Sequence, residues 1–254
     1  MFENLTWQPD RMLLDDLVFR LEHFKADNWD LGEQCFKFYK TDGLVREYAE
    51  FLKNRPDFKP ERVLELGIWD GGSIAFWFEL FHPKKHVAID LKQRQDSPYF
   101  ERYVESRGLR ENIRTYWNVD QADRPAISGI CAREFDGALD LVIDDASHLY
   151  GPTKASFETL FPLLRPGGLY VIEDWAWGHW ADYQRPDHPW AKEIPLTQLV
   201  IELIECIGGP AAPIRRLTVS HGFVVAERAW HSRGELGDFK LDNYISRRPA
   251  TSPA

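Results

Sequence analysis

The stretch that decides the fold runs from Leu139 to Trp175 and reads LDLVIDDASHLYGPTKASFETLFPLLRPGGLYVIEDW. Its two short apolar runs, Leu139–Ile143 and Leu169–Ile172, are typical of buried strands. Between them lies a segment of helix length, which the sequence RPGG at positions 165–168 should end. The pattern predicts a strand–helix–strand unit with parallel strands and a right-handed crossover. We therefore expect an α/β fold.

Acidic residues follow both of these strands. Asp144 and Asp145 end the first strand, and Glu173 and Asp174 end the second. Because parallel strands share a direction, we expect the four carboxylates to meet at the carboxyl edge of the sheet, where open α/β sheets bind ligands. A hard divalent cation would relieve their repulsion, and Asp145, Glu173 and Asp174 are the predicted ligands. The other interpretation is that these acids cap the helices that follow.

A second motif lies upstream, where the chain reads VLELGIWDGGS from Val63 onward. An apolar strand ends in a glycine-rich turn, and an aromatic helix over Ile74–Phe81 follows. Glycine lets the backbone turn tightly and approach a ligand closely. No Lys-Ser or Lys-Thr pair follows the glycines, so the loop is not a P-loop. The turn predicts a cofactor pocket; its candidate residues are Glu65, Gly67, Gly71 and Ser73.

The next strand, His86–Leu91, carries Asp90 near its end. An acid at this point can accept hydrogen bonds from two ribose hydroxyls of a nucleoside cofactor. The alternative is a surface acid without a ligand. A helix over Pro98–Arg107 and a third strand over Ile113–Val119 should follow.

The segment 175–193 is rich in tryptophan, polar and interrupted by proline. A long irregular loop at the carboxyl edge is typical of a lid or a binding loop. Aromatic faces with nearby polar groups suit a sugar ring, so the segment predicts an acceptor loop. The equally weighted alternative is that the tryptophans pack the loop against its own domain. The candidate acceptor contacts are Trp175, Trp177, His179 and Tyr150.

The composition limits the partners and the compartment. The chain has 254 residues, 44% of them hydrophobic, and a formal net charge of −9, which argues against nucleic-acid binding. No apolar run approaches membrane length, and the first residues lack the basic start and apolar stretch of a signal peptide. The three cysteines form no CxxC pair, which suits reduced thiols. We expect a cytoplasmic protein with no membrane or nucleic-acid partner.

The remaining segments suggest three parts. Residues 1–60 predict a helical extension, with helices over Arg11–Phe24 and Asp42–Leu52. The first of these helices could cover the active site or pair with another subunit. Residues 61–230 should form the α/β domain, which closes with a helix over Ile194–Ile207 and a hairpin. The hairpin strands are Ile214–Val219 and Gly222–Glu227, and a polar tail occupies 231–254.

Taken together, ELGIWDGGS, VAIDL, VIDDASH, RPGGLYVIEDW and the hairpin resemble the metal-dependent sugar O-methyltransferases of the macrocin, mycinamicin and rhamnosyl group. These belong to the class I enzymes that use S-adenosylmethionine (SAM). The resemblance covers roughly Arg62 to Glu227. The common form of the glycine motif in these enzymes is acidic-x-Gly-x-Gly-x-Gly, and Trp69 replaces its middle glycine. The resemblance implies a Rossmann-like fold: a seven-stranded, mostly parallel sheet with one antiparallel strand from the C-terminal hairpin and helices on both faces.

The resemblance also implies an activity, the transfer of a methyl group from SAM to a sugar hydroxyl with the help of Mg²⁺. The acceptor would be a glycosylated natural product, another small molecule or an oligosaccharide, and the enzyme a homo-oligomer. Carried over to this chain, Asp145, Glu173 and Asp174 hold Mg²⁺ and His148 acts as the base, so that Asp145 and His148 form the catalytic pair. The candidate cofactor contacts gain three members, Asp120, Gln121 and Asp144.

Three other functions fit parts of the pattern. The first is a metal-independent small-molecule or phenol O-methyltransferase, in which the acids position the acceptor. The second is an aminopropyltransferase, which also carries paired aspartates at this edge. The third is a non-catalytic subunit with a SAM-binding fold. The second acid pair and the loop rich in tryptophan and histidine favour the sugar enzyme, and the set of Glu65, Asp90, Asp145 and His148 argues against a non-catalytic subunit.

Overall fold

The main sheet has seven strands in the order β10-β11-β9-β8-β5-β6-β7. The computed structural model describes residues 2–21, 34–93, 95–209, 211–230 and 239–245. β11 pairs antiparallel with both β9 and β10, and the other pairs are parallel, so a single strand runs against the rest. This confirms the predicted sheet. Its strands are β5 (Arg62–Leu66), β6 (Lys85–Asp90), β7 (Ile113–Trp117), β8 (Leu139–Asp144), β9 (Leu164–Glu173), β10 (Ile214–Val219) and β11 (Phe223–Arg228).

The strand order places a switch point at β5. From β5 the chain adds β6 and then β7 on one side, whereas β8 and β9 follow on the other side. At such a point the connections leave the sheet in opposite directions, and a crevice opens outside the carboxyl ends of the strands. The loops after β5, β6 and β8 therefore surround one space.

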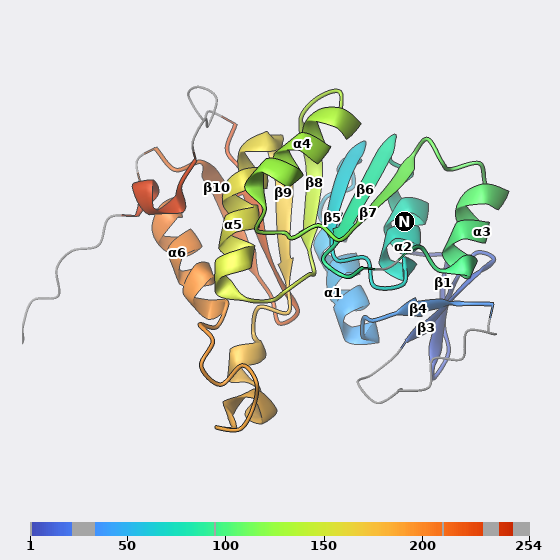
Figure 1. The fold of residues 1–254 in the computed structure, drawn as a ribbon, viewed down its shortest axis with the longest axis horizontal. Helices are drawn as coiled ribbons and strands as arrows, with labels where there is room; N and C mark the ends of the chain where they lie inside the picture. The colour runs from blue at the N-terminus through green and yellow to red at the C-terminus, as the bar shows by residue number, and fades with distance from the viewer. Residues whose placement is uncertain (1, 22–33, 94, 210, 231–238, 246–254) are drawn as a thin grey trace, which may run out of the picture.

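Helices cover both faces of the sheet (Figure 1). α4, α5 and α6 pack on one face and α1, α2 and α3 on the other, each set forming one hydrophobic cluster with the strands. Within the described part of the chain, no helix is long and apolar enough to span a membrane. The helices are α1 (Asp42–Lys53), α2 (Gly72–Phe81), α3 (Pro98–Ser106), α4 (Arg124–Glu134), α5 (Tyr150–Leu160) and α6 (Thr197–Ile207).

Helix α1 confirms the prediction for Asp42–Leu52 and brings polar groups to the sheet edge. The Thr41 side chain caps it by accepting a hydrogen bond from the Leu44 backbone N–H. Its buried stripe consists of Val45, Tyr48 and Leu52, which pack on the sheet. The cap fixes the chain direction at the residue just before it, Lys40, which is also buried.

The helix predicted over Arg11–Phe24 is wrong for its described part. Residues 11–21 form a hairpin of two strands that belongs to a separate four-stranded sheet, and residues 22–24 lie outside the described residues. The buried side chains of the hairpin alternate along each strand, a period of two that the helical count overlooked. The described part of the N-terminal extension therefore combines helix α1 with a small sheet; its strands are β1 (Leu5–Trp7), β2 (Arg11–Leu14), β3 (Leu17–Leu21) and β4 (Phe36–Phe38).

One further helix boundary differs from the prediction, and one helix was not predicted. Helix α5 ends at Leu160, before the RPGG sequence, and a 3₁₀ turn over Phe161–Leu163 carries Pro162. Strand β9 then includes RPGG, where Gly167 has a φ of +76°. Helix α4 was not predicted at all, because its buried residues form only a narrow apolar stripe after an Asp123 cap.

The structure describes only part of the predicted polar tail. Residues 231–238 and 246–254 lie outside the described residues. Between them, Phe239 and Leu241 are buried in the cluster that contains α5 and α6, and a 3₁₀ turn spans Leu241–Tyr244. This part of the tail therefore packs onto the main domain.

Candidate active site

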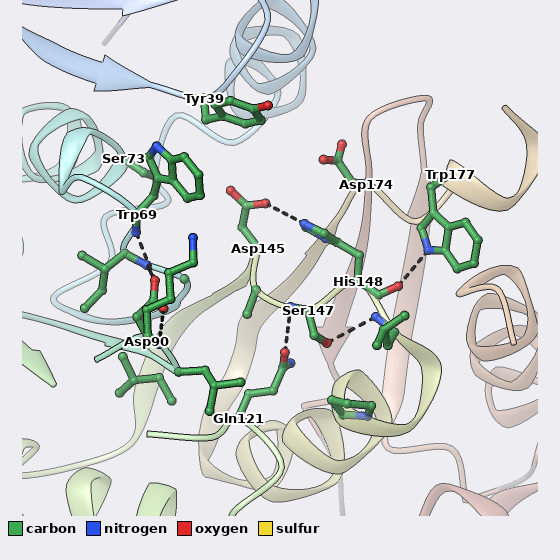
Figure 2. A pocket seen from close by; sticks show the side chains of 18 of the residues that line it. Tyr39, Trp69, Ser73, Asp90, Gln121, Asp145, Ser147, His148, Asp174 and Trp177 are labelled. Atoms are coloured by element: carbon green, nitrogen blue, oxygen red, sulfur yellow. Dashed lines mark hydrogen bonds and ion pairs between the residues drawn. The ribbon is translucent and has the colours of Figure 1, made fainter. Parts of the chain in front are cut away.

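A cavity of about 540 Å³ lies at the switch point of the sheet. Its size suits a cofactor or a drug-sized ligand. The loops after β5, β6 and β8 line one part of the cavity, and the 175–193 loop lines another part (Figure 2). The lining residues named in the sequence analysis are Gly67, Trp69, Ser73, Asp90, Asp120, Gln121, Asp145, His148, Asp174 and Trp177. Glu65, Gly71, Asp144, Tyr150, Glu173, Trp175 and His179 do not line it.

The glycine turn after β5 owes its shape to two glycines. Gly67 has a φ of +100°, and a Cβ there would lie 2.2 Å from the carbonyl oxygen of Asp145. Only glycine therefore lets the β5 turn pack against the β8 loop. Gly71, with a φ of +83°, precedes α2 and lies against the ring of Phe100. The turn brings the part of the cavity that is predicted to bind the cofactor next to the loop that carries Asp145.

Asp90 stabilises the same turn from the end of β6. Its Oδ2 accepts hydrogen bonds from the backbone N–H groups of Ile68 and Trp69 at 3.0 and 3.1 Å. Its Oδ1 accepts one from the Lys92 backbone N–H at 2.8 Å. These three hydrogen bonds leave one acceptor site on Oδ1, so Asp90 can still accept a hydrogen bond from a ribose hydroxyl.

Trp69 stands where the common motif has its middle glycine. It adopts a φ of +52°, a left-handed conformation that is uncommon for a bulky residue. Its ring lies 5.4 Å from that of Tyr39, and the Lys92 Nζ sits 3.7 Å from its centre. The substitution thus adds an aromatic wall to the cavity, and a cation–π contact stabilises that wall.

Two predicted cofactor residues lie beneath the cavity. Glu65 is fully buried in β5 and its Oε2 lies 3.2 Å from His86 Nε2. Asp144 accepts hydrogen bonds from Ser156, Tyr170 and Gln121 on the α5 side of the sheet, because successive residues of a strand face opposite sides. Burial raises the pKa of Asp144 to about 6 although these hydrogen bonds lower it.

Asp144 reaches the cavity indirectly, through Gln121. The Gln121 Nε2 donates to Asp144, and its Oε1 accepts a hydrogen bond from the backbone N–H of Ser147 at 2.9 Å. Gln121 lines the cavity and so does Ser147. Asp144 therefore orients a cavity residue and the loop that carries His148.

The acid end of the cavity contains three converging side chains (Figure 2). Asp145, His148 and Asp174 each offer one ligand atom, and these atoms lie within 4.8 Å of one another. His148 Nε2 is 3.8 Å from Asp145 Oδ1. Both His148 and Asp174 have positive φ values, 56° and 51°, and such strained backbone is common at functional sites.

Glu173, predicted as a metal ligand, is not part of that group. Its Oε2 accepts a hydrogen bond from Lys40 Nζ at 2.6 Å, and its Oε1 accepts one from the Tyr48 hydroxyl at 2.7 Å. Lys40 also contacts Asp145 Oδ2 at 2.7 Å. Lys40 and Tyr48 were not among the predicted site residues, because nothing in the local sequence around Lys40 separates it from a surface lysine.

Burial and the mutual influence of the charges shift the pKa values in the cluster. Burial alone would lower the pKa of Lys40, but Asp145, Glu173 and Glu65 raise it well above its ordinary value, so the group is an ammonium. Burial, followed by the charge of Asp145, raises the pKa values of Glu173 and Asp174. One ammonium thus faces several carboxylates, which favours a further cation.

Asp145 and Asp174 fit a hard divalent cation. Both line the cavity, and within the described part of the chain no hydrogen bond to the Asp174 carboxylate is formed. Mg²⁺ in enzymes is usually held by one or two carboxylates and keeps several waters, which a substrate can replace. The donor set present therefore suits such an ion.

The 175–193 loop packs on itself and also lines the cavity. Its aromatic rings pack on one another, as the 5.0 Å distance between the Trp177 and Trp190 rings shows, and four of them line the cavity. Trp177 Nε1 also donates to the His148 carbonyl oxygen at 2.8 Å. The four lining aromatics are Trp177, Trp180, Tyr183 and Trp190.

Three of the four predicted acceptor contacts point elsewhere. Trp175 Nε1 donates to the Ser220 carbonyl oxygen at 2.9 Å, and His179 Nε2 lies 2.8 Å from the Thr197 hydroxyl. The Tyr150 hydroxyl donates to Glu202 at 2.8 Å. Of the predicted set, only Trp177 faces the cavity.

Comparison with known proteins agrees with this geometry. Residues 64–175 match the family model Methyltransf_24, described as a methyltransferase domain. A solved structure of MycE methyltransferase from the mycinamycin biosynthetic pathway, in complex with Mg, SAH and mycinamycin VI, superposes with a TM-score of 0.57 at 28% identity. That match covers 76% of this chain and 51% of MycE. The class I methyltransferase fold predicted from the sequence is confirmed.

The chain is also similar to curated O-methyltransferases. It is 33% identical over 153 residues to demethylmacrocin O-methyltransferase of Streptomyces fradiae, covering 58% of this chain and 35% of that one. It is 36% identical over 164 residues to mycinamicin VI 2''-O-methyltransferase of Micromonospora griseorubida, covering 61% and 38%. The predicted resemblance is thereby confirmed. The chain spans well under half the length of these relatives.

Proposed function

We propose that this methyltransferase is a SAM- and Mg²⁺-dependent O-methyltransferase that acts on a sugar hydroxyl of a small-molecule glycoside or oligosaccharide. The observation that carries the proposal is one continuous cavity with two ends. The β5 turn and Asp90 form one end, and Asp145, His148 and Asp174 form the other. A structural relative that contains Mg and SAH supports the assignment of the two ends.

At the cofactor end, SAM would supply an electrophilic methyl group. Asp90 would accept hydrogen bonds from the ribose hydroxyls, and Gly67 would let the backbone lie close to the cofactor. Asp120 and Gln121 line the side of the cavity toward β7. These contacts would align the methyl group with the acceptor oxygen for an in-line displacement.

At the acid end, Asp145 and Asp174 would hold the divalent cation. When bound, the cation would stabilise the negative charge that develops on the acceptor oxygen. His148 lies beside Asp145, with its Nε2 directed into the same space (Figure 2), and would take the proton from the hydroxyl. Glu173, the third ligand predicted from the sequence, lies apart from these two acids, because Lys40 and Tyr48 donate hydrogen bonds to its oxygens.

The acceptor would lie against the aromatic wall of the 175–193 loop. Trp177, Trp180 and Tyr183 present rings to the cavity next to the acid cluster. Such rings contact the apolar C–H faces of a sugar, whereas carboxylates and histidine suit its hydroxyls. Two further curated relatives are named as methyltransferases of rhamnosyl tetracenomycin-C, and a glycoside of this kind is consistent with this arrangement.

The test is methyl transfer from labelled SAM to a panel of acceptors, with Mg²⁺ and with EDTA. The panel contains free sugars, oligosaccharides, natural-product glycosides and catechols. We expect turnover on a sugar-bearing acceptor that depends on Mg²⁺. Turnover on phenols alone would contradict the proposed acceptor class.

One observation favours a second candidate, a metal-independent O-methyltransferase. The Lys40 ammonium already contacts Asp145 and Glu173, so part of the negative charge is compensated without a metal. In that enzyme the acids would position the acceptor. Full turnover in excess EDTA would identify it.

Replacing Asp90 with alanine is expected to weaken SAM binding by about 1–3 kcal/mol, because ribose hydroxyls would lose their acceptor. Calorimetry with SAM measures the change. Asp136→Ala, which removes an exposed acid at the opposite edge, is the matched control and should bind SAM like the unmodified protein. Equal SAM affinity in the Asp90 variant would remove Asp90 from the cofactor site.

The compartment and assembly are part of the proposal. Two of the three cysteines, Cys131 and Cys206, are buried thiols, which suits the cytoplasm. The resemblance to sugar O-methyltransferases supports a homo-oligomer, which light scattering of the purified protein would detect.

A further inference from the structure

We propose that Lys40 is a built-in counter-cation of the acid cluster, which keeps Glu173 from coordinating a divalent cation and leaves Asp145 and Asp174 as its carboxylate ligands. The inference rests on the proposed function only in assuming that this end of the cavity binds a divalent cation. It concerns a residue of the N-terminal extension, outside the segment that matches the methyltransferase family model.

The first step of the argument is the saturation of Glu173. Its side chain is 1% exposed, and each of its two oxygens accepts a hydrogen bond from a buried donor. Lys40 Nζ is 2.6 Å from one oxygen, and the Tyr48 hydroxyl is 2.7 Å from the other. Tyr48 belongs to α1, and Lys40 lies two residues before the start of that helix. Helix α1 packs on the sheet.

The second step is the different direction of the neighbouring acid. Glu173 ends β9 in the interior, whereas Asp174 adopts a φ of +51° and lines the cavity. The left-handed turn therefore separates the two carboxylates that the sequence places side by side. Asp174 joins Asp145 and His148, and Glu173 joins Lys40 and Tyr48.

The third step is the rigidity of this arrangement. The Tyr48 ring stacks on Phe223 at 4.3 Å and lies edge-on to Trp77 at 4.7 Å, so its hydroxyl is held in place. Withdrawing the buried Lys40 ammonium would leave two carboxylates unpaired in a poorly solvated site, which is strongly unfavourable. Lys40 is therefore a fixed part of the cluster.

The fourth step is charge balance. Asp145, Glu173 and Asp174 would carry three negative charges when ionised, and Lys40 carries one positive charge. A divalent cation brings the formal charge of the cluster to zero. The same cation is repelled by the Lys40 ammonium, so it should bind more weakly than it would to three carboxylates.

Calorimetric titration with Mg²⁺ and Mn²⁺ tests the proposal. Lys40→Met should tighten cation binding by at least about tenfold, because it removes the repulsion and releases a Glu173 oxygen. The gain should disappear in the Lys40→Met, Glu173→Gln double variant. Lys53→Met removes an exposed charge at the end of α1 and should bind cations like the unmodified protein.

Unchanged or weaker cation binding by folded Lys40→Met would overturn the proposal; SAM affinity and thermal melting report whether it is folded. If it does not fold, two single variants decide. Glu173→Gln should weaken cation binding clearly less than Asp174→Asn does, and equal losses would overturn the proposal. The proposed function has a separate measurement, which is acceptor turnover. If no acceptor is methylated but cations still bind, the proposed function fails and the role of Lys40 is unaffected. If no variant binds a cation, both proposals are wrong.

Discussion

A chain in which alanine replaces His148 is expected to lose turnover by about 10²–10⁴-fold, the usual contribution of a general base. His148 Nε2 faces the space shared with Asp145 and Asp174, where the acceptor hydroxyl would lie. A sugar hydroxyl is barely acidic, so it needs a group that removes its proton as the bond to the methyl group forms. A neutral imidazole can do so, whereas a protonated one cannot.

The loss should appear in turnover and not in cofactor affinity, because a base acts only in the transfer step. The measurement is turnover of the variant and of the unmodified protein at saturating SAM and Mg²⁺. SAM binding should remain, because His148 lies at the acid end of the cavity. A variant with near-normal turnover would show that His148 has a structural role.

Replacing Asp174 with asparagine is expected to reduce turnover by on the order of 10²–10³-fold, because several kcal/mol of charge stabilisation by the cation would be lost. The amide has nearly the same shape as the carboxylate, so the left-handed turn at this residue should be preserved. Asparagine also tolerates positive φ. The variant should therefore fold, bind SAM and fail in the transfer step.

The control for this prediction is Asp187→Asn, which removes an exposed acid of the 175–193 loop that pairs with Arg185. It should leave the Mg²⁺ dependence unchanged. Turnover would be measured over a range of Mg²⁺ concentrations, with EDTA as the limiting case. If Asp174→Asn kept full turnover at low Mg²⁺, the cation would not depend on this acid.

Local sequence determined the elements of the main sheet. Runs such as Arg62–Leu66 and Leu139–Asp144 are apolar and short, and glycine or acid follows them, so their nature as buried parallel strands could be predicted. The ends of those strands in turn located Gly67, Asp90 and Asp145 around one crevice, because parallel strands point the same way.

The hairpin at 11–21 shows where local pattern was insufficient. Its apolar residues satisfy both a helical spacing and a strand alternation, and pairing with β1 and β4 decides between them. The local sequence also did not show that Asp144 and Asp145 face opposite sides of the sheet. Adjacent strand-end acids diverge, and only Asp145 enters the cavity.

The sequence by itself determined the class I methyltransferase sheet and the positions of the acids and His148 at its carboxyl edge, because strand pattern and strand ends are local properties. Only the tertiary structure decided which acids act together. Lys40 comes to Asp145 and Glu173 across 105 and 133 residues of chain, and Tyr48 reaches Glu173 across 125. Such contacts depend on how α1 packs against the sheet, and no spacing along the chain encodes that packing.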